Sequence, residues 1–265
     1  MIRLEGVSRT YDLGGRPVHA LVEVTEEIAA GEHVAIMGPS GSGKSTLLNV
    51  IGCLDRPTAG SYFLDGREVA GLSEGELDLV RRHRIGFVFQ AFHLVGRLSA
   101  LENVELPMVF AGVPRRERRR RSAAALAAVG LAERADHRPD QLSGGERQRA
   151  ALARATVMEP AILLADEPSG NLDTGSGRQV LDLLDRMNDA GLTLVVVTHD
   201  PNVARRADRL LVLVDGRIAK RLPASEIHSL DELFATEEEP GRVEAPSPLG
   251  HHDAERRGRE GRGSG

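Results

Sequence analysis

The chain has 265 residues, of which 41% are hydrophobic, and its formal net charge at pH 7 is −5. This length fits one large domain or two small ones, and the negative charge excludes a global basic field that would attract nucleic acid. No apolar run reaches the length of a membrane span, and the single cysteine, Cys53, excludes an internal disulfide or a thiolate metal cluster.

Residues 1–32 alternate apolar and polar positions, as at Ile2, Leu4 and Val7. Such alternation predicts antiparallel strands. The early charges do not fit a secretory signal, so we expect a cytoplasmic protein. Tyr11 lies between two of these strands. Its ring could stack on a base, but a lone tyrosine is also typical of core or surface packing, and spacing alone favours packing.

A short apolar strand, a glycine-rich turn and a helix start follow one another over His33–Gly52. The turn fits the pattern Gly-x-x-x-x-Gly-Lys-Ser/Thr, and its residues are Gly38, Pro39, Ser40, Gly41, Ser42, Gly43, Lys44, Ser45 and Thr46. Glycines let consecutive N–H groups point at an anion, and the helix start adds free amides and a positive dipole end. We therefore expect a phosphate site in which Lys44 reaches the β- and γ-phosphates and the Ser45 hydroxyl ligates Mg²⁺.

Gln90 follows the end of a second apolar strand, Ile85–Phe89. Ligands of parallel α/β sheets bind outside the carboxyl ends of the strands. Gln90 is therefore placed to contact a ligand, although a polar residue without a role fits this position as well.

Residues 91–160 have a helical pattern, with a basic run over Arg115–Arg121 before an alanine-rich stretch. A nucleic-acid patch is one interpretation of this run. No aromatic residues interleave with the arginines, so a solvated helix face is the interpretation that we favour.

Ser143 precedes a helix that begins with Gly144 and Gly145, and Glu146 completes a capping-box pattern. The same residues suit a second anion site at a helix N-terminus. One triphosphate needs only one cradle per chain, so a second site suggests a nucleotide that is held by another copy.

The unbroken apolar run Ala161–Ala165 is typical of a parallel strand that is buried on both faces. Asp166 and Glu167 follow it, and two carboxylates there are costly unless a cation is present. We expect Asp166 to hold Mg²⁺ directly or through water and Glu167 to orient or deprotonate an attacking water. A helix-start feature is the alternative for this acid pair.

A polar turn over Ser169–Asp173 precedes a predicted helix of roughly Gly177–Asn188. The next buried strand, Leu192–Val197, ends just before His199. This histidine could donate to a γ-phosphate, or it could be an ordinary loop residue.

The set of motifs resembles that of the ATP-binding-cassette ATPases, the nucleotide-binding subunits of ABC transporters, over about residues 1–225. The matching stretches are Tyr11 (adenine-stacking aromatic), Gly38–Thr46 (Walker A), Gln90 (Q-loop), Leu142–Gln148 (signature), Ile162–Glu167 (Walker B with the catalytic glutamate), Ser169–Asp173 (D-loop) and His199 (switch histidine). The resemblance reverses the interpretation of Tyr11 that spacing alone favours.

The resemblance implies an α/β fold with a P-loop NTPase core of mostly parallel sheet, an N-terminal antiparallel β subdomain and a helical subdomain over about residues 91–155. We expect the ATPase domain to span residues 1–232, with a final strand pair over 210–222. Beyond about Thr236 the composition turns to Glu, Gly, Pro and Arg, which predicts a disordered tail over 233–265.

The resemblance also implies ATP and Mg²⁺ as cofactors and a homodimer that sandwiches the nucleotides. The nucleotide-binding residues would be the Walker A stretch, Tyr11, Asp173 and, from the other copy, Ser143, Gly144 and Gly145. The catalytic residues would be Glu167, His199 and Gln90. The metal ligands would be Ser45, Gln90 and Asp166.

Three finer matches, Ile51–Asp55, Gly86–Gln90 and Leu163–Pro168, resemble the branch of the family that serves macrolide efflux and lipoprotein release. They imply ATP hydrolysis coupled to a membrane permease on a separate chain, at the cytoplasmic face of the membrane and without nucleic acid. The same branch includes a cell-division ATPase, so regulation of a membrane partner without solute transport stays open. The sequence lacks the inserted coiled coils, zinc modules and tandem cassettes of DNA-repair and translation members.

Overall fold

The computed structural model describes residues 1–226, so the predicted tail lies outside the described residues. The strands are β1 (Ile2–Asp12), β2 (Pro17–Ile28), β3 (His33–Met37), β4 (Ala59–Leu64), β5 (Arg67–Glu68), β6 (Ile85–Phe89), β7 (Ile162–Asp166), β8 (Thr193–Val197), β9 (Arg209–Val214) and β10 (Arg217–Pro223). The helices are α1 (Lys44–Ile51), α2 (Glu74–Arg84), α3 (Ala100–Phe110), α4 (Arg115–Ala128), α5 (Gly144–Thr156), α6 (Thr174–Asp189) and α7 (Pro201–Ala204), with short 3₁₀ turns at η1 (Ala132–Arg134), η2 (Pro139–Gln141) and η3 (Ala224–Glu226).

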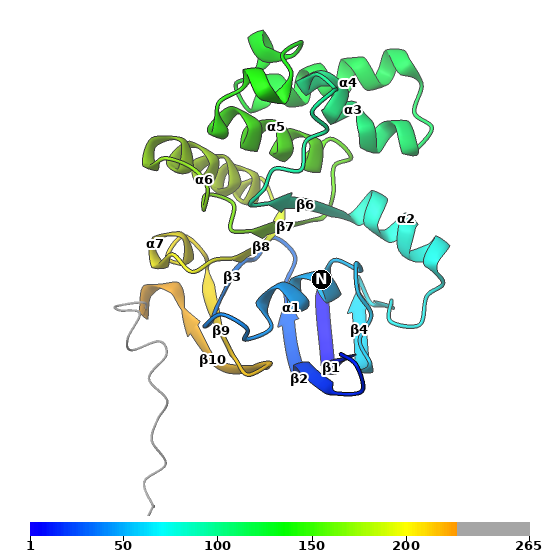
Figure 1. Ribbon diagram of the computed structural model, residues 1–265, viewed down its shortest axis with the longest axis vertical. Helices are drawn as coiled ribbons and strands as arrows, with labels where there is room; N and C mark the ends of the chain where they lie inside the picture. The colour runs from blue at the N-terminus through cyan, green and yellow to red at the C-terminus, as the bar shows by residue number, and fades with distance from the viewer. Residues whose placement is uncertain (227–265) are drawn as a thin grey trace, which may run out of the picture. The chain divides into compact units, whose positions relative to one another are not determined.

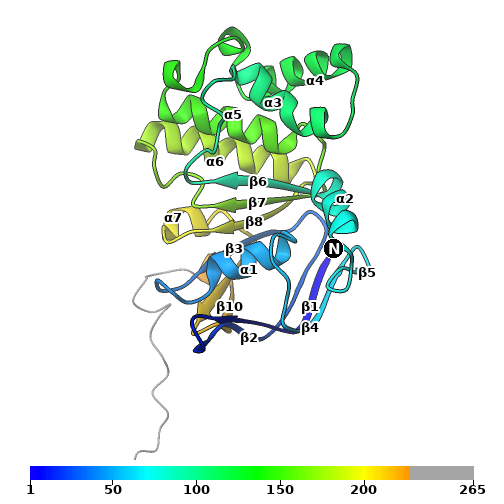
Figure 2. The same ribbon diagram turned by 45° about the vertical axis from the view of Figure 1, so that its right-hand side comes forward.

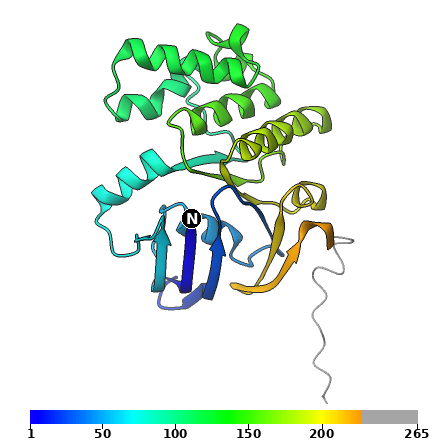
Figure 3. The ribbon, with the colours of Figure 1, turned by 180° about the vertical axis from the view of Figure 1, so that it is seen from behind.

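The strands form two sheets (Figure 1). One is antiparallel, with the order β2-β1-β4-β5. The other has the order β10-β9-β3-β8-β7-β6 and is parallel except for β10 at its edge. Helices α3, α4 and α5 gather together beyond the second sheet (Figure 3). The predicted α/β class, with an antiparallel N-terminal part and a helical part, is confirmed.

The central strands are buried on both faces, as their unbroken apolar runs predict. Every residue of β3 and β8 is buried, and in β7 only the last residue is partly exposed. Successive side chains of a strand point to opposite faces, so Leu164 joins a core cluster with α1 and the antiparallel sheet, whereas Leu163 joins a second cluster with α3 to α6. The sheet therefore separates α1 from the helical part, as Figure 2 also shows.

The strand register brings the carboxyl ends of neighbouring strands to one edge of this sheet. Phe89 of β6 pairs with Asp166 of β7, Asp166 pairs with Val197 of β8, and Ile36 of β3 pairs with the same valine. The residues that follow these strands must therefore lie close together at this edge. Open α/β sheets bind their ligands at the same edge.

Helix α6 begins at Thr174, earlier than the predicted start at Gly177. The carboxylate of Asp173 caps the helix by accepting a hydrogen bond from the Ser176 amide at 3.0 Å. An aspartate cap stabilises the first turn, so the helix extends back through residues whose sequence pattern is not amphipathic.

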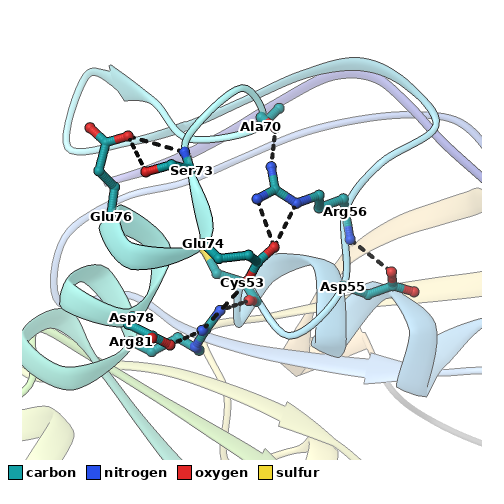
Figure 4. A network of polar contacts seen from close by, with 9 residues as sticks. All are labelled: Cys53, Asp55, Arg56, Ala70, Ser73, Glu74, Glu76, Asp78 and Arg81. Atoms are coloured by element: carbon teal, nitrogen blue, oxygen red, sulfur yellow. Dashed lines mark hydrogen bonds and ion pairs between the residues drawn. The ribbon is translucent and has the colours of Figure 1, made fainter.

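The segment after α1 is tied to α2 by a polar network (Figure 4). The Arg56 guanidinium donates to the Glu74 carboxylate at 3.1 and 2.8 Å and to the Ala70 carbonyl at 3.2 Å. The Arg81 guanidinium donates to the Cys53 carbonyl at 2.7 Å. The apolar neighbours of Cys53 in the sequence predict a buried thiol inside a helix. The thiol is buried, but Cys53 lies in a turn after α1, with a φ of 54°. Burial raises the pKa of its thiol to about 11, so it stays protonated at neutral pH.

An ion-pair cluster joins the antiparallel sheet to the edge of the parallel one. The Glu26 carboxylate of β2 accepts hydrogen bonds from Arg209 of β9 and from Arg221 of β10, both at 2.7 Å. The Glu26 side chain is only 6% exposed. A buried carboxylate is tolerated only when it is paired, and both partners of Glu26 come from the neighbouring sheet.

His33 is the buried histidine at the start of β3. Its Nε2 atom has no hydrogen-bond partner within the described residues. Burial lowers the pKa of the imidazole, although Asp185 and Asp208 oppose the shift. The unfolded chain therefore binds a proton at this position before the folded chain does.

We expect the free energy of unfolding to fall as the pH drops below about 6.5, the ordinary pKa of histidine. Above that pH both states carry neutral His33 and its contribution is complete, and it is lost as the pH falls toward the lowered folded pKa. His33→Leu should reduce this loss, measured by urea unfolding at pH 7.5 and 5.5. His83→Leu, which alters an exposed histidine of α2, is the control. Equal pH dependence in the two variants would contradict the prediction.

Candidate functional site

The loop between β3 and α1 has the backbone that a phosphate cradle requires. Gly41 and Gly43 have φ values of 79° and 101°, in the left-handed region that favours glycine. A Cβ on Gly38 would lie 2.1 Å from the Leu213 carbonyl oxygen, and one on Gly43 would lie 2.3 Å from that of Ala20. No side chain caps the start of α1, so its first amides are available to an anion.

Lys44 lies across its own loop. Its ammonium Nζ donates to the carbonyl oxygens of Gly38 at 2.8 Å and Pro39 at 2.9 Å. Burial lowers the pKa of this ammonium, while the charges of Glu167 and Asp166 raise it. A phosphate is a stronger acceptor for an ammonium than a carbonyl is, so the Lys44 side chain is placed to move to one.

Asp166 is the last residue of β7, and the positive charge near its carboxylate does not fully balance the cost of burying a negative charge there. Burial raises the pKa of this carboxyl, the neighbouring charge of Glu167 raises it further, and Lys44 opposes the shift. A divalent cation would stabilise the ionised form of this acid pair. The electrostatics of the site therefore fit a bound metal ion.

The donor set near Asp166 fits Mg²⁺ among the divalent cations. The further oxygen ligands that the sequence predicts are Ser45 in the first turn of α1 and Gln90 after β6. Among residues 1–226, no three His, Cys, Asp or Glu side chains cluster as a metal site. Mg²⁺ usually takes few protein ligands and keeps waters and substrate phosphate oxygens, so a sparse oxygen set is what it needs.

Glu167 is held in one orientation by the residues that follow β8. Its carboxylate accepts a hydrogen bond from the Thr198 hydroxyl at 3.2 Å and lies 2.6 Å from Nδ1 of His199. Its backbone has a φ of 46°, a left-handed conformation that is uncommon for a non-glycine residue. The Glu167 side chain is 16% exposed and that of His199 is 74% exposed. This arrangement keeps the carboxylate fixed and oriented, as a general base requires.

Gln90 lies beside the D-loop as well as beside β7. Its amide nitrogen donates to the Asn171 side-chain oxygen at 3.2 Å, and the Asn171 amide donates back to the Gln90 carbonyl at 3.1 Å. These two bonds connect the predicted metal ligand to the turn that leads from Glu167 into α6.

Tyr11, the second-last residue of β1, has a fixed orientation. Its hydroxyl donates to the Asp55 carboxylate at 2.5 Å, and the Arg9 guanidinium lies 4.4 Å from the centroid of its ring. Arg9 is in turn paired with Asp55 at 2.8 Å. Arg9 covers one face of the ring by a cation–π contact, so a base would have to stack on the opposite face.

Ser143, Gly144 and Gly145 lie at the start of α5, away from the phosphate loop of the same chain. The strands β6, β7 and β8 lie between α5 and α1 in both Figure 1 and Figure 2. The capping box is confirmed, because Ser143 and Glu146 exchange hydrogen bonds of 2.8 and 3.2 Å. A Cβ on Gly145 would lie 2.7 Å from the Ser176 side chain, so close packing against α6 requires glycine there.

The structure thus brings Lys44, Asp166, Glu167, Gln90 and His199 to one edge of the sheet, whereas the sheet separates α5 from α1. Tyr11 and Asp173 each already bond a neighbouring side chain or amide. Sequence reasoning missed the partners of these residues, which are Asn171, Thr198, Arg9 and Asp55. Asn171 lies inside the recognised D-loop, but no sequence pattern indicates the contacts of the other three.

The similarity of the chain to known proteins identifies its family. The family model described as "ABC transporter" matches residues 21–170, which is more than half of the chain. The chain is 52% identical over 218 residues to the "Macrolide export ATP-binding/permease protein MacB 1/2" of Paracoccus denitrificans, covering 82% of this chain and 33% of that protein. It is 50% identical to the "Uncharacterized ABC transporter ATP-binding protein YvrO" of Bacillus subtilis, covering 82% of this chain and 95% of that protein. The chain therefore spans about a third of the macrolide export relative and nearly all of the second relative.

A solved structure supports the same assignment. A dimeric post-hydrolysis state of the ATP-binding cassette MJ0796, bound to ADP and Pi, is similar with a TM-score of 0.78 and 46% identity, over 84% of this chain and 99% of that one. The Walker A loop, the acid pair and their strand-end arrangement agree with this likeness. The chain belongs to the ABC transporter family and is an ATPase of the ATP-binding-cassette type.

Proposed function

We propose that this ATPase is the nucleotide-binding subunit of an ABC transporter of the export or lipoprotein-release type. Its ATP-driven dimerisation would act on a membrane permease on a separate chain, at the cytoplasmic face of the membrane. The observation that carries the proposal is the Glu167–His199 contact of 2.6 Å next to Asp166, at the same sheet edge as the phosphate loop.

In this proposal the residues divide the work of hydrolysis. Lys44 and the loop amides hold the β- and γ-phosphates, and Mg²⁺ supplies positive charge at those phosphates when Asp166, Ser45 and Gln90 hold it. Glu167 accepts a proton from the attacking water. His199, which is largely exposed, is free to turn from Glu167 toward a γ-phosphate oxygen.

A homodimer is proposed because the start of α5 cannot serve the phosphate loop of its own chain. Ser143 to Gly145 would contact the triphosphate of the second copy. Two observations support this arrangement. The first is the separation of α5 from α1 by the sheet. The second is that the similar solved structures are dimers.

The membrane partner is proposed from the relatives and from one surface feature. Among residues 1–226 every helix is too short or too polar to cross a bilayer, and the macrolide export relative is named as both ATP-binding protein and permease. A hollow of about 450 Å³ lies between α2, β6, α3 and α5. Its lining includes Phe110, which is 72% exposed, three arginines (Arg81, Arg82 and Arg154) and one acid, Asp78, which pairs with Arg81. It suits a partner segment with apolar and acidic side chains.

Lys44→Ala should weaken ATP binding roughly 10- to 100-fold, because a hydrogen bond to a charged group contributes about 1.5–3 kcal/mol. Binding of a fluorescent ATP analogue measures the change. Lys220→Ala, which removes the other lysine of the chain, should bind ATP as the wild type does. Unchanged affinity in Lys44→Ala would exclude a phosphate contact for this lysine.

Glu167→Gln should lower steady-state ATP hydrolysis at least about 100-fold, because a positioned general base contributes 10²–10⁴-fold. ATP should still bind, and the trapped nucleotide should favour a dimer that size-exclusion chromatography detects. Glu133→Gln, at an exposed position in η1, serves as the control. Normal turnover in Glu167→Gln would remove Glu167 as the base.

The partner is tested by co-purification from the native membrane, followed by reconstitution of the complex into vesicles. We expect an integral membrane protein to raise ATP turnover and a solute or lipoprotein to be moved or released. Stimulated hydrolysis without any movement would favour regulation of a membrane partner over transport. A chain that binds no membrane protein would contradict both.

A further inference from the structure

Gln148, the single glutamine of α5, is fully buried, with 0% exposure. Its amide Nε2 donates to the Pro168 carbonyl at 2.7 Å and lies 3.4 Å from the Phe89 carbonyl. Pro168 directly follows Glu167, and Phe89 directly precedes Gln90. One side chain therefore contacts the backbone next to two of the residues to which hydrolysis is assigned above, Glu167 and Gln90.

The backbone at both places is in a conformation that needs support. Glu167 has a φ of 46°, and Phe92 and His93, just after Gln90, have φ values of 60° and 50°. A non-glycine residue in the left-handed region is less stable by about 1–2 kcal/mol. Such turns persist only where surrounding contacts hold them.

Helix α5 supplies those contacts on both sides. Besides Gln148, Arg154 donates to the His93 carbonyl at 2.6 Å and to the Phe92 carbonyl at 3.0 Å. The Arg147 guanidinium lies 5.1 Å from the centroid of the Phe92 ring. The turn after Gln90 is thus fastened to α5 from several directions, whereas the turn after Glu167 is joined to α5 by the Gln148 amide.

The environment of Oε1, the second polar atom of the Gln148 side chain, indicates that this residue does not serve stability alone. Its Oε1 atom is buried and has no hydrogen-bond partner within residues 1–226, and a buried unsatisfied acceptor destabilises a fold by about 1–3 kcal/mol. An apolar side chain of the same size would avoid this penalty. It would also leave the Pro168 carbonyl without its donor. The contribution of glutamine at this position is therefore the hydrogen bond that fixes the turn after Glu167.

We propose that Gln148 is a positioning residue for hydrolysis, whose amide holds the turns that carry Glu167 and Gln90 in register with helix α5. This inference rests on the roles of Glu167 and Gln90 in the proposed function. The start of α5 faces a second copy in that proposal, but Gln148 faces inward and acts on the catalytic turns of its own chain.

The test variant is Gln148→Met, which keeps the length of the side chain and removes the donor. The control is Gln179→Met on the exposed face of α6, where the glutamine accepts a hydrogen bond from Arg149. We expect kcat to fall about 10- to 100-fold in Gln148→Met, since a misplacement of about 1 Å can lower a rate 10²-fold. KM and the dissociation constant of ATP should change less than about twofold, because the phosphate loop is untouched. Gln179→Met should behave as the wild type.

Turnover is expressed per folded molecule, with the folded fraction taken from circular dichroism, so that simple destabilisation does not imitate the effect. Gln148→Leu, which is smaller and also removes the donor, should lower kcat in the same way and covers the case in which the methionine variant does not fold. Wild-type kcat in either folded variant, or a rise in KM without a fall in kcat, would overturn the proposal. Glu167→Gln is assayed alongside, because normal turnover there would overturn the site assignment itself, whereas its loss together with full activity in Gln148→Met would overturn only the role of Gln148.

Discussion

Two carboxylates, those of Asp166 and Glu167, stand side by side at the end of a strand that is buried on both faces, and the surrounding site compensates for their charge. Burial and mutual repulsion raise the pKa of Asp166, and a charge in such a place is stable only near opposite charges or hydrogen-bond donors. Lys44 supplies the positive charge, while His199 and Thr198 contact the Glu167 carboxylate. A magnesium ion with phosphate bound beside it would complete this compensation. The negative charge that is unfavourable in the free site therefore favours binding of the metal ion.

The parallel register explains why these groups meet at all. Strands β3, β8, β7 and β6 are neighbours in the sheet and run in the same direction. Their carboxyl ends fall on one edge, so residues that are more than 100 positions apart in the chain, such as Lys44 and Glu167, act within one site. The apolar strands thus serve function indirectly, because their burial on both faces fixes the register of the polar residues that follow them.

The N-terminal end and the inner face of helix α5 have different roles in the proposed mechanism. Its N-terminal residues are left apart from the phosphate loop of the same chain, as a site for a second copy would be. Its inner face contacts the turns after Glu167 and Gln90 through Gln148 and Arg154. A change in the position of α5 when two copies close would therefore reach the catalytic turns directly. Tyr11 is connected through Asp55 and the adjacent Arg56 to Glu74 of α2, so the residue proposed to stack on the base is also anchored to the scaffold.

The sequence by itself determined the class of fold, the buried strands of the parallel sheet, and the positions of the motif residues along the chain. Unbroken apolar runs predict buried parallel strands, and the glycine-lysine pattern before α1 predicts a phosphate loop whatever surrounds it, because both signals are local. Only the tertiary structure decided which side chains meet. The contacts of Glu167 with Thr198 and His199, of Gln90 with Asn171, of Tyr11 with Arg9 and Asp55, and of Gln148 with Pro168 join residues whose separation in the chain carries no periodic signal. They follow from strand register and helix packing, and these are properties of the folded chain as a whole.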